Sequence, residues 1–212
     1  MIVNSSGCQL ECGIDEAGRG SFLGRLYVGA VIFPKDIVLD SSIVKDSKKF
    51  HSRKKREKAA EYVKTHALSY QVDWAEPSDI DAQGIGRCLT ETIHRCIKRL
   101  SIKPDFLLID GNKYQEDMTN QIPYELKIHG DDTYFSIAAA SILAKVAHDN
   151  HILELLKNHS ELREYQIDTN MGYGTAVHQQ ALRRLGVTPF HRRTFCEKTL
   201  GLRTETRQKC LI

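Results

Sequence analysis

Two adjacent carboxylates near the start of the chain are the residues best suited to chemistry. Asp15 and Glu16 follow an apolar run, and Gly18, Arg19 and Gly20 come directly after them in the segment GIDEAGRG. Carboxylates at the end of a strand suit a divalent cation such as Mg²⁺. Glycines let a backbone approach a ligand closely, and an arginine between them suits a phosphate or a sugar. Metal binding and phosphate binding so close together indicate phosphoryl-transfer chemistry on a nucleic acid.

Further acids stand where an α/β fold places its ligands. Asp110 ends the apolar segment FLLID, and Asp131 follows a short strand and precedes a long helix. The exit of a buried strand is a usual ligand position in such folds. The residues alone leave other roles open, namely a turn at DGN for Asp110 and a helix N-cap for Asp131. Asp132 is an immediate rival to Asp131, and we interpret Asp149, later on the helix, as a structural residue.

Convergence of these acids would require cations. Two unit charges about 4 Å apart repel by roughly 4 kcal/mol at an effective dielectric constant near 20, and several such pairs would be intolerable without a counter-charge. Two divalent ions roughly 4 Å apart would hold the attacking water and the leaving oxygen of an in-line displacement. Our hypothesis is therefore that Asp15, Glu16, Asp110 and Asp131, if they converge, bind two divalent ions, Mg²⁺ or Mn²⁺.

The elements that must position these residues follow from hydrophobic periodicity. We expect five strands, at residues 9–14, 26–33, 68–74, 106–110 and 124–129. We expect helices at residues 53–66, from a cap at 78 or 79 to about 100, from 133 to about 158, and at 175–185. Strands that come first and then alternate with helices indicate an α/β domain around a mixed sheet. At 212 residues the chain fits one domain.

Positive charge is concentrated in two segments of the chain and is not spread evenly along it. The net charge is only +3, but two basic regions stand out, at residues 45–58 and 183–207. They suit a localised phosphate-binding face, although the first run alone also fits a solvated helix face.

The cysteine pattern and the N-terminal sequence indicate the cellular compartment. The six cysteines form no C-x-x-C pair, which argues against zinc and thioredoxin-like sites and favours a reducing compartment. The start of the chain does not resemble a signal peptide, and no run reaches the length of a membrane span. We expect a cytoplasmic monomer with no membrane partner.

Seven short motifs occur in one order along most of the chain. They are GIDEAGRG, DSKKF at 46–50, LLIDGN at 107–112, HGD at 129–131, SIAAASILAKV at 136–146, GYGT at 172–175 and TPFHRRTF at 188–195. Together they resemble the type 2 ribonuclease H family, ribonuclease HII. The resemblance implies a ribonuclease H-like fold with a five-stranded mixed sheet flanked by helices. It also implies a C-terminal helical substrate-binding region and tail at 160–212, within a single catalytic domain at 1–212.

The same resemblance implies an activity and its residues. The family cleaves the RNA strand of RNA–DNA hybrids and incises 5′ of single ribonucleotides in duplex DNA, so these nucleic acids are the expected partners. The four carboxylates named above resemble the family's metal ligands, and spacing to the AAAS helix favours Asp131 over Asp132. The triplet at 18–20 resembles the loop that reads the 2′-hydroxyl, which distinguishes RNA from DNA. Tyr173 resembles the tyrosine that stacks on the deoxyribose after the ribonucleotide, although a core aromatic fits the residues alone. Lys48 is a candidate phosphate contact.

The chain departs from the family pattern at three places. Ser21 stands where proline usually follows the glycine-arginine-glycine triplet, Arg25 stands where proline usually follows glycine, and His148 replaces the arginine before Asp149. The missing prolines predict a less rigid loop. No departure removes a carboxylate, so we expect activity to be retained.

Three rival functions and two side roles complete the predictions. Ribonuclease HIII shares the catalytic core but carries an extra N-terminal domain, for which a motif beginning at residue 13 leaves no room. A nucleic-acid-binding protein without catalysis would not need the carboxylates, and a different nuclease or resolvase on this fold would not need the ribonucleotide-reading motifs. Ser141 has no triad context, so we expect it to pack, and we expect His148 and His151 to be exposed.

Overall fold

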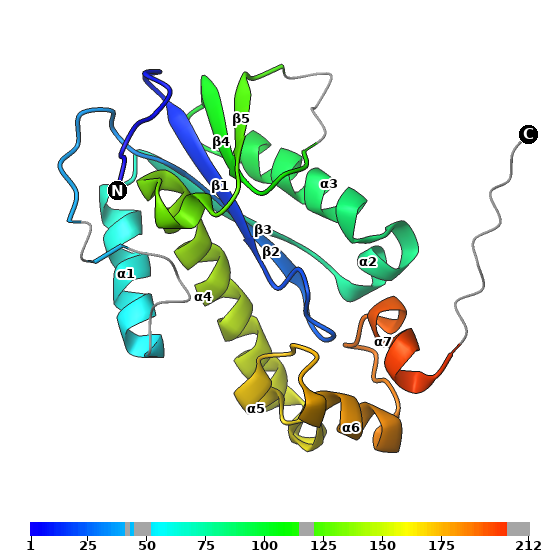
Figure 1. Cartoon of the computed structure of the whole chain (residues 1–212). Coiled ribbons are helices and arrows are strands. Elements are labelled where there is room, and N and C mark those ends of the chain that lie inside the picture. Colours follow the sequence, from blue (N-terminus) through cyan, green and yellow to red (C-terminus); the bar gives the residue numbers. More distant parts are fainter. Residues whose placement is uncertain (41–42, 45–51, 115–120, 203–212) are drawn as a thin grey trace, which may run out of the picture.

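A five-stranded mixed sheet forms the centre of the computed structural model (Figure 1). The model describes residues 1–40, 43–44, 52–114 and 121–202. The strand order is β3-β2-β1-β4-β5; β1 is antiparallel to β2 and parallel to β4. β2 and β3 are antiparallel, and β4 and β5 are parallel. The strands are β1 (Glu11–Ala17), β2 (Leu26–Ile32), β3 (Ser69–Ala75), β4 (Phe106–Asp110) and β5 (Tyr124–Lys127).

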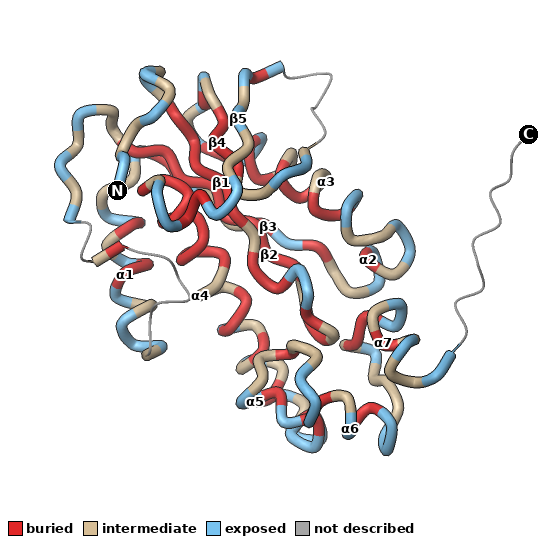
Figure 2. The backbone as a smooth tube through the Cα atoms, in the orientation of Figure 1, coloured by how far each residue is buried: buried red, intermediate tan, exposed pale blue. Residues whose placement is uncertain are grey.

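Helices cover both faces of the sheet. The helices are α1 (Arg53–His66), α2 (Pro77–Gln83), α3 (Ile85–Lys98), α4 (Phe135–Asn158), α5 (Ile167–Asn170), α6 (Ala176–Leu185) and α7 (Arg193–Leu200). Short 3₁₀ turns are η2 (Gly130–Asp132) and η3 (Ser160–Tyr165). One apolar core joins α3 to the sheet, and a second joins α1 and α4 to the opposite face. The central strands and α4 are accordingly the most continuously buried segments (Figure 2).

The close approach of α4 to the sheet depends on two glycines. A Cβ atom on Gly13 would lie 2.1 Å from the carbonyl carbon of Ser136, and one on Gly29 would lie 2.4 Å from the carbonyl oxygen of Ala140. Both contacts are with helix backbone, which no side-chain rotation can move. The run of small residues in α4 completes the fit, so the helix lies directly on β1 and β2.

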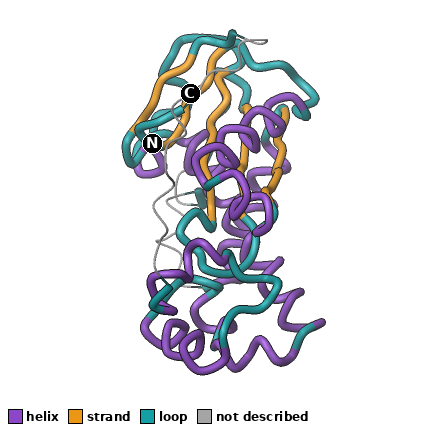
Figure 3. The backbone as a smooth tube through the Cα atoms, turned by 90° about the vertical axis from the view of Figure 1, so that its right-hand side faces the viewer, coloured by secondary structure: helices purple, strands orange, loops and turns teal. Residues whose placement is uncertain are grey.

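The C-terminal helices pack around a core of their own. α5, α6 and α7 gather at the end of α4 that lies away from the sheet (Figures 1 and 3). Their buried residues form a separate cluster with Leu23, Ile152 and Leu156. The long helix α4 ends at Asn158 and the short turn η3 begins at Ser160, close to the predicted boundary at 160. The division into two regions and the substrate-binding role of the second stay predictions.

The expected fold is confirmed, and several boundaries are corrected. The strand predicted to end at residue 14 continues to Ala17, so Asp15 and Glu16 lie inside β1 because its antiparallel ladder with β2 extends past them. The helix predicted from 78 or 79 to 100 is broken at Gly84, whose φ of 85° is incompatible with a helix. The long helix begins at Phe135 rather than 133, and the fifth strand ends at Lys127 rather than 129.

In the part of the chain that the structure describes, no helix combines the length and the apolar character needed to cross a bilayer.

Candidate active site

The sheet itself brings Asp15 and Asp110 to one edge. In the parallel ladder between β1 and β4, the last matched pair is Ile14 with Ile109. The next residues along the two strands are Asp15 and Asp110, which therefore leave the ladder side by side. On its other side, Asp15 is held opposite Gly29 of β2. The position of the first carboxylate is thus set by backbone pairing with two neighbours.

The surroundings of Asp15 disfavour its charge. The residue is 6% exposed, and burial raises its pKa well above the usual range; the negative charges of Glu16 and Asp110 raise it further. A hydrogen bond from Ser141 and the Glu16 N–H, 2.7 Å from Oδ1, act in the opposite direction. A cation would relieve the remaining cost, because it favours the ionised carboxylate.

Glu16 is less confined than its neighbour. Burial raises its pKa as well, and the Arg19 guanidinium offsets part of the effect. The two side chains form an ion pair with Nη1 and Oε1 3.3 Å apart, in which the arginine is half exposed. Asp110 adds a smaller repulsion. The arginine of the glycine-arginine-glycine triplet is therefore electrostatically coupled to the acidic cluster.

Asp110 connects the sheet to the turn that carries Asp131. Its Oδ1 accepts a hydrogen bond of 2.7 Å from the backbone N–H of Gly130. Asp131 follows in η2 and is 3% exposed. The N-cap position of α4 belongs to Tyr134, so the alternative role of Asp131 as the helix cap is wrong. Asp131 is therefore a buried carboxylate in the short turn that Asp110 contacts at Gly130, and a role other than helix capping is open to it.

One cavity of about 470 Å³ joins most of the predicted residues. Its lining comprises Asp15, Glu16, Ala17, Gly18, Arg19, Gly20, Asp110, Ser141, Lys145 and Tyr173. Asp131 is not on this lining, and Lys48 lies outside the described residues. Within the described ranges, no three Asp, Glu, His or Cys side chains already form a metal-binding group. The structure therefore brings three of the four acids to the same cavity as the triplet and the tyrosine.

Two residues of this cavity were not predicted from the sequence. Ser141 was expected only to pack, yet it hydrogen-bonds Asp15. Lys145, one turn further along α4, pairs with Asp149 at 2.7 Å and lies 5.4 Å from the centre of the Tyr173 ring. Residues 141, 145 and 149 follow each other at intervals of four, which places them on one face of a helix. That spacing was the available signal.

Arg192 holds the loop of the triplet from the C-terminal side. It lies just before α7 and is fully buried. Its Nη1 donates to the carbonyl of Arg19 and its Nε to the carbonyl of Gly24, both at 3.0 Å. Burial lowers its pKa to about 10. Arg192 belongs to a basic region that the sequence indicated as suited to phosphate binding, but its guanidinium is buried and binds loop carbonyls instead.

The donor set fits a hard divalent cation. Asp15, Glu16 and Asp110 supply only carboxylate oxygens, the ligands that Mg²⁺ and Mn²⁺ prefer. The two acids on β1 have pKa values raised chiefly by burial and further by neighbouring acids. Bound positive charge would reverse this effect, so the residues present are compatible with a metal site.

Comparison with known proteins identifies the family of the chain. A family model for ribonuclease HII matches residues 12–198. The chain is 40% identical over 186 residues to ribonuclease HII of Bacteroides thetaiotaomicron, covering 88% of this chain and 89% of that protein.

Solved structures of related proteins have a similar fold. The ribonuclease H2 from Pyrococcus horikoshii OT3 matches with a TM-score of 0.72 at 24% identity, covering 90% of this chain and 96% of that one. The Bst-RNase HIII in complex with Mn²⁺ matches with a TM-score of 0.68 at 16% identity, covering 92% and 70%. Both show that the fold is shared.

The sheet, its flanking helices and the acidic edge define a nuclease of the ribonuclease H-like class. The chain belongs to the ribonuclease HII family. It is an endoribonuclease, a hydrolase of the type that acts on RNA–DNA hybrids.

Proposed function

We propose that this enzyme incises duplex DNA on the 5′ side of a single embedded ribonucleotide, as well as cleaving RNA in continuous hybrids. The observation that carries the proposal is the shared cavity: the carboxylates, the triplet at 18–20 and Tyr173 line the same space. A hydrolytic site and a ribonucleotide-reading surface next to each other suit cleavage at an RNA–DNA junction.

The four acids share one role in this proposal. Asp15, Glu16 and Asp110 hold divalent cations, and Asp131 is the fourth acidic ligand. When bound at these acids, two such ions would help to activate the attacking water and to stabilise the leaving oxygen, and cleavage would give 3′-hydroxyl and 5′-phosphate ends. No side chain acts as a nucleophile in this proposal. The acids act on the reacting phosphate only through the cations that they hold.

The recognition side works through backbone and ring contacts. The loop at Gly18, Arg19 and Gly20 binds the sugar-phosphate backbone and reads the 2′-hydroxyl, the group that separates RNA from DNA. Tyr173 stacks on the deoxyribose that follows. Lys48, outside the described residues, is proposed as a phosphate contact.

The test is strand cleavage of a labelled duplex carrying one ribonucleotide. Reactions contain Mg²⁺, Mn²⁺ or EDTA, and a continuous RNA–DNA hybrid and an all-DNA duplex run in parallel. We expect a metal-dependent nick 5′ of the ribonucleotide that is absent in Asp15→Asn. Cleavage of the hybrid without the single-ribonucleotide nick would refute junction recognition. Binding of either duplex without any cleavage would favour a binding protein.

A further inference from the structure

His148 lies buried in α4 directly beneath the loop that carries the triplet. The residue is 0% exposed, contrary to the expectation of an exposed side chain. A Cβ atom on Gly18 would come within 2.4 Å of the His148 Cδ2 atom. Gly18 also has a φ of 77°, a conformation that glycine adopts freely. The loop backbone therefore rests on the imidazole ring.

Both ring nitrogens of His148 have partners. Nε2 lies 3.3 Å from the hydroxyl of Ser21, and Nδ1 lies 3.2 Å from Oδ1 of Asp149. Asp149 also pairs with Arg56 at 3.0 Å and with Lys145 at 2.7 Å. An acid with two cationic partners accepts rather than donates, so Nδ1–H donates to Asp149 and Nε2 accepts from the Ser21 hydroxyl.

The electrostatic surroundings of His148 favour its neutral form, which these hydrogen bonds require. Burial lowers its pKa, and the nearby charges of Lys145 and Arg192 lower it further, against the effect of Asp149. Burial alone would raise the pKa of Asp149, but hydrogen bonds from His148 and Lys145 bring it below its usual value. A neutral imidazole over an ionised carboxylate has a fixed tautomer and therefore a fixed acceptor for Ser21.

The same ring also lies against the other half of the recognition surface. The centre of the His148 ring is 5.7 Å from that of Tyr173. Ser21 and Tyr173 are joined by an antiparallel backbone bridge, and the Phe22 N–H donates to the carbonyl of Gly172 at 2.8 Å. One buried side chain thus supports both the loop and the tyrosine.

Ser21 and His148 contact each other through the serine hydroxyl and the ring Nε2. A proline at 21 would have no hydroxyl to donate, and an arginine at 148 would have no acceptor to offer. The serine is useful only with an acceptor beneath it, and the histidine supplies one. The serine hydroxyl and the imidazole therefore form a matched donor and acceptor.

We infer that His148 is a positioning residue that, through Ser21, holds the glycine-arginine-glycine loop against Tyr173 and so sets the preference for a single ribonucleotide over a continuous hybrid. The inference rests on the proposed function of that loop. A continuous hybrid offers 2′-hydroxyls at every position, whereas a single ribonucleotide must be met in one register. Loss of loop alignment should therefore affect the junction substrate more.

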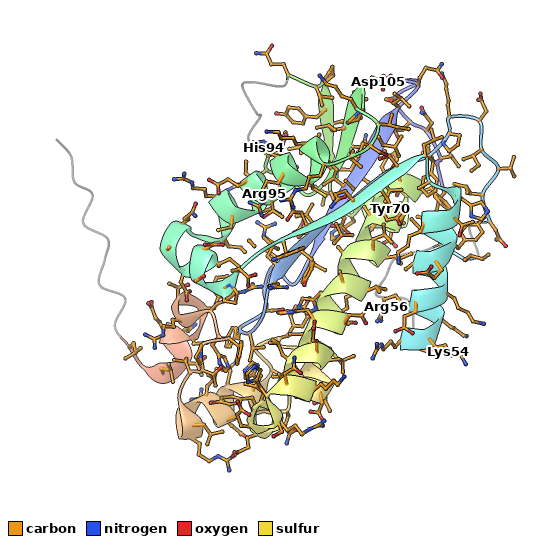
Figure 4. All side chains as sticks on the ribbon, turned by 180° about the vertical axis from the view of Figure 1, so that it is seen from behind. Lys54, Arg56, Tyr70, His94, Arg95 and Asp105 are labelled. Carbon is orange, nitrogen blue, oxygen red and sulfur yellow. The ribbon has the colours of Figure 1, made fainter. Side chains whose placement is uncertain are left out.

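The test measures kcat and KM on both substrates for the wild type, Ser21→Ala, His148→Phe, the double variant and His148→Gln. Phenylalanine keeps a ring beneath Gly18 but removes both hydrogen bonds, and glutamine retains an acceptor. His94→Phe is the matched control, because His94 lies on α3 at a distance from the loop (Figure 4). Melting temperatures and circular dichroism establish that each variant folds.

We expect Ser21→Ala and His148→Phe each to lower the ratio of kcat/KM for the junction substrate to that for the hybrid by roughly three- to tenfold, the range of one hydrogen bond. The double variant should lose no more than the worse single variant, because both remove the same interaction. His148→Gln should stay within about twofold of the wild type, and His94→Phe should not change the ratio.

Two outcomes would contradict the inference and are distinguishable. If the wild type incises at a single ribonucleotide but Ser21→Ala leaves the ratio unchanged, the inference fails and the proposed function stands. If the wild type does not incise there at all, the proposed function fails first. Should His148→Phe not fold, Ser21→Ala alone decides, since it removes one hydroxyl and leaves the ring in place.

Discussion

The two sides of the cavity are held in place by different means. On the catalytic side, Asp15 and Asp110 belong to strands, and the register of the β1–β4 ladder puts them next to each other. On the recognition side, the loop at 18–20 lies outside any strand ladder and is held by side chains, chiefly Arg192 and His148. Backbone pairing tolerates most side-chain changes, whereas support by side chains depends on a few specific residues.

The two sides also differ in electrostatic balance. The acids repel one another, and burial raises the pKa of Asp15 and of Glu16. On the recognition side, Arg192 forms two hydrogen bonds to carbonyls. Its Nη2 and the Nε of Arg25 are among the buried side-chain atoms without a hydrogen-bond partner in the described part of the chain. The catalytic side is thus unfavourable until cations bind, while the recognition side is already ordered.

The largest effect should come from Asp15→Asn. We expect cleavage of both substrates to fall by at least about 10²–10³-fold, the range for losing one group that stabilises developing charge. Because the native pKa is raised, the metal-free protein should lose stability as pH rises from the unfolded value near 4 through the native pKa. Asparagine removes this penalty.

The measurement is the melting temperature in EDTA as a function of pH. The metal-free variant should melt above the wild type at pH 7, and addition of Mn²⁺ should raise the melting temperature of the wild type more. Asp36→Asn, at an exposed position, is the control. A variant less stable than the wild type at neutral pH would show that Asp15 is not electrostatically disfavoured.

A second effect concerns the contact between α4 and the sheet. In Gly29→Ala the new Cβ would lie 2.4 Å from the carbonyl of Ala140, so the helix must move and carry Ser141 away from Asp15. We expect a loss of about 1–3 kcal/mol in the free energy of unfolding, as for overpacked cores, measured by urea denaturation. Gly86→Ala, in α3 with open space around it, should instead stabilise by up to about 1 kcal/mol.

The strands and the contact between α4 and the sheet show which features of the fold and the site can be predicted from the sequence. Hydrophobic periodicity located all five strands and predicted α1 with its observed bounds, because both depend on local patterns. The register that aligns Asp15 with Asp110 is a property of two remote segments, and motif spacing only suggested it. The burial of His148 could not be predicted, since the loop that covers it lies about 130 residues earlier in the chain. Ser141 was missed although its spacing from Lys145 was visible.

The third effect separates the two sides of the cavity. Arg192→Gln removes the donors to the carbonyls of Arg19 and Gly24. We expect a loss of about 1.5–3 kcal/mol in stability, the range for hydrogen bonds from charged groups, and a larger drop in cleavage at a single ribonucleotide than in cleavage of a hybrid. Arg193→Gln is the adjacent control, because that residue is exposed. Equal losses on both substrates would mean that the loop is not held separately from the acids.

The smallest effect tests the one side chain that connects the two sides. Arg19 belongs to the loop, yet its guanidinium pairs with Glu16 and lowers the pKa of that acid against the effect of burial. Arg19→Ala should reduce cleavage at a single ribonucleotide by about tenfold, equivalent to about 1.4 kcal/mol. Without the arginine the pKa of Glu16 rises further, so a larger fraction of Glu16 is protonated at low pH. The acid limb of the pH–rate profile should therefore move to higher pH.

Lys54→Ala is the control for Arg19→Ala, because Lys54 is an exposed cation on α1 that is not on the cavity lining (Figure 4). Loss of a phosphate contact alone should weaken binding to all duplexes similarly and leave the pH profile in place. If both variants lower cleavage equally and neither moves the acid limb, Arg19 acts only as one more surface charge. A shift confined to Arg19→Ala would show that recognition and catalysis share a titrating group, and that the ordered side of the cavity tunes the unfavourable one.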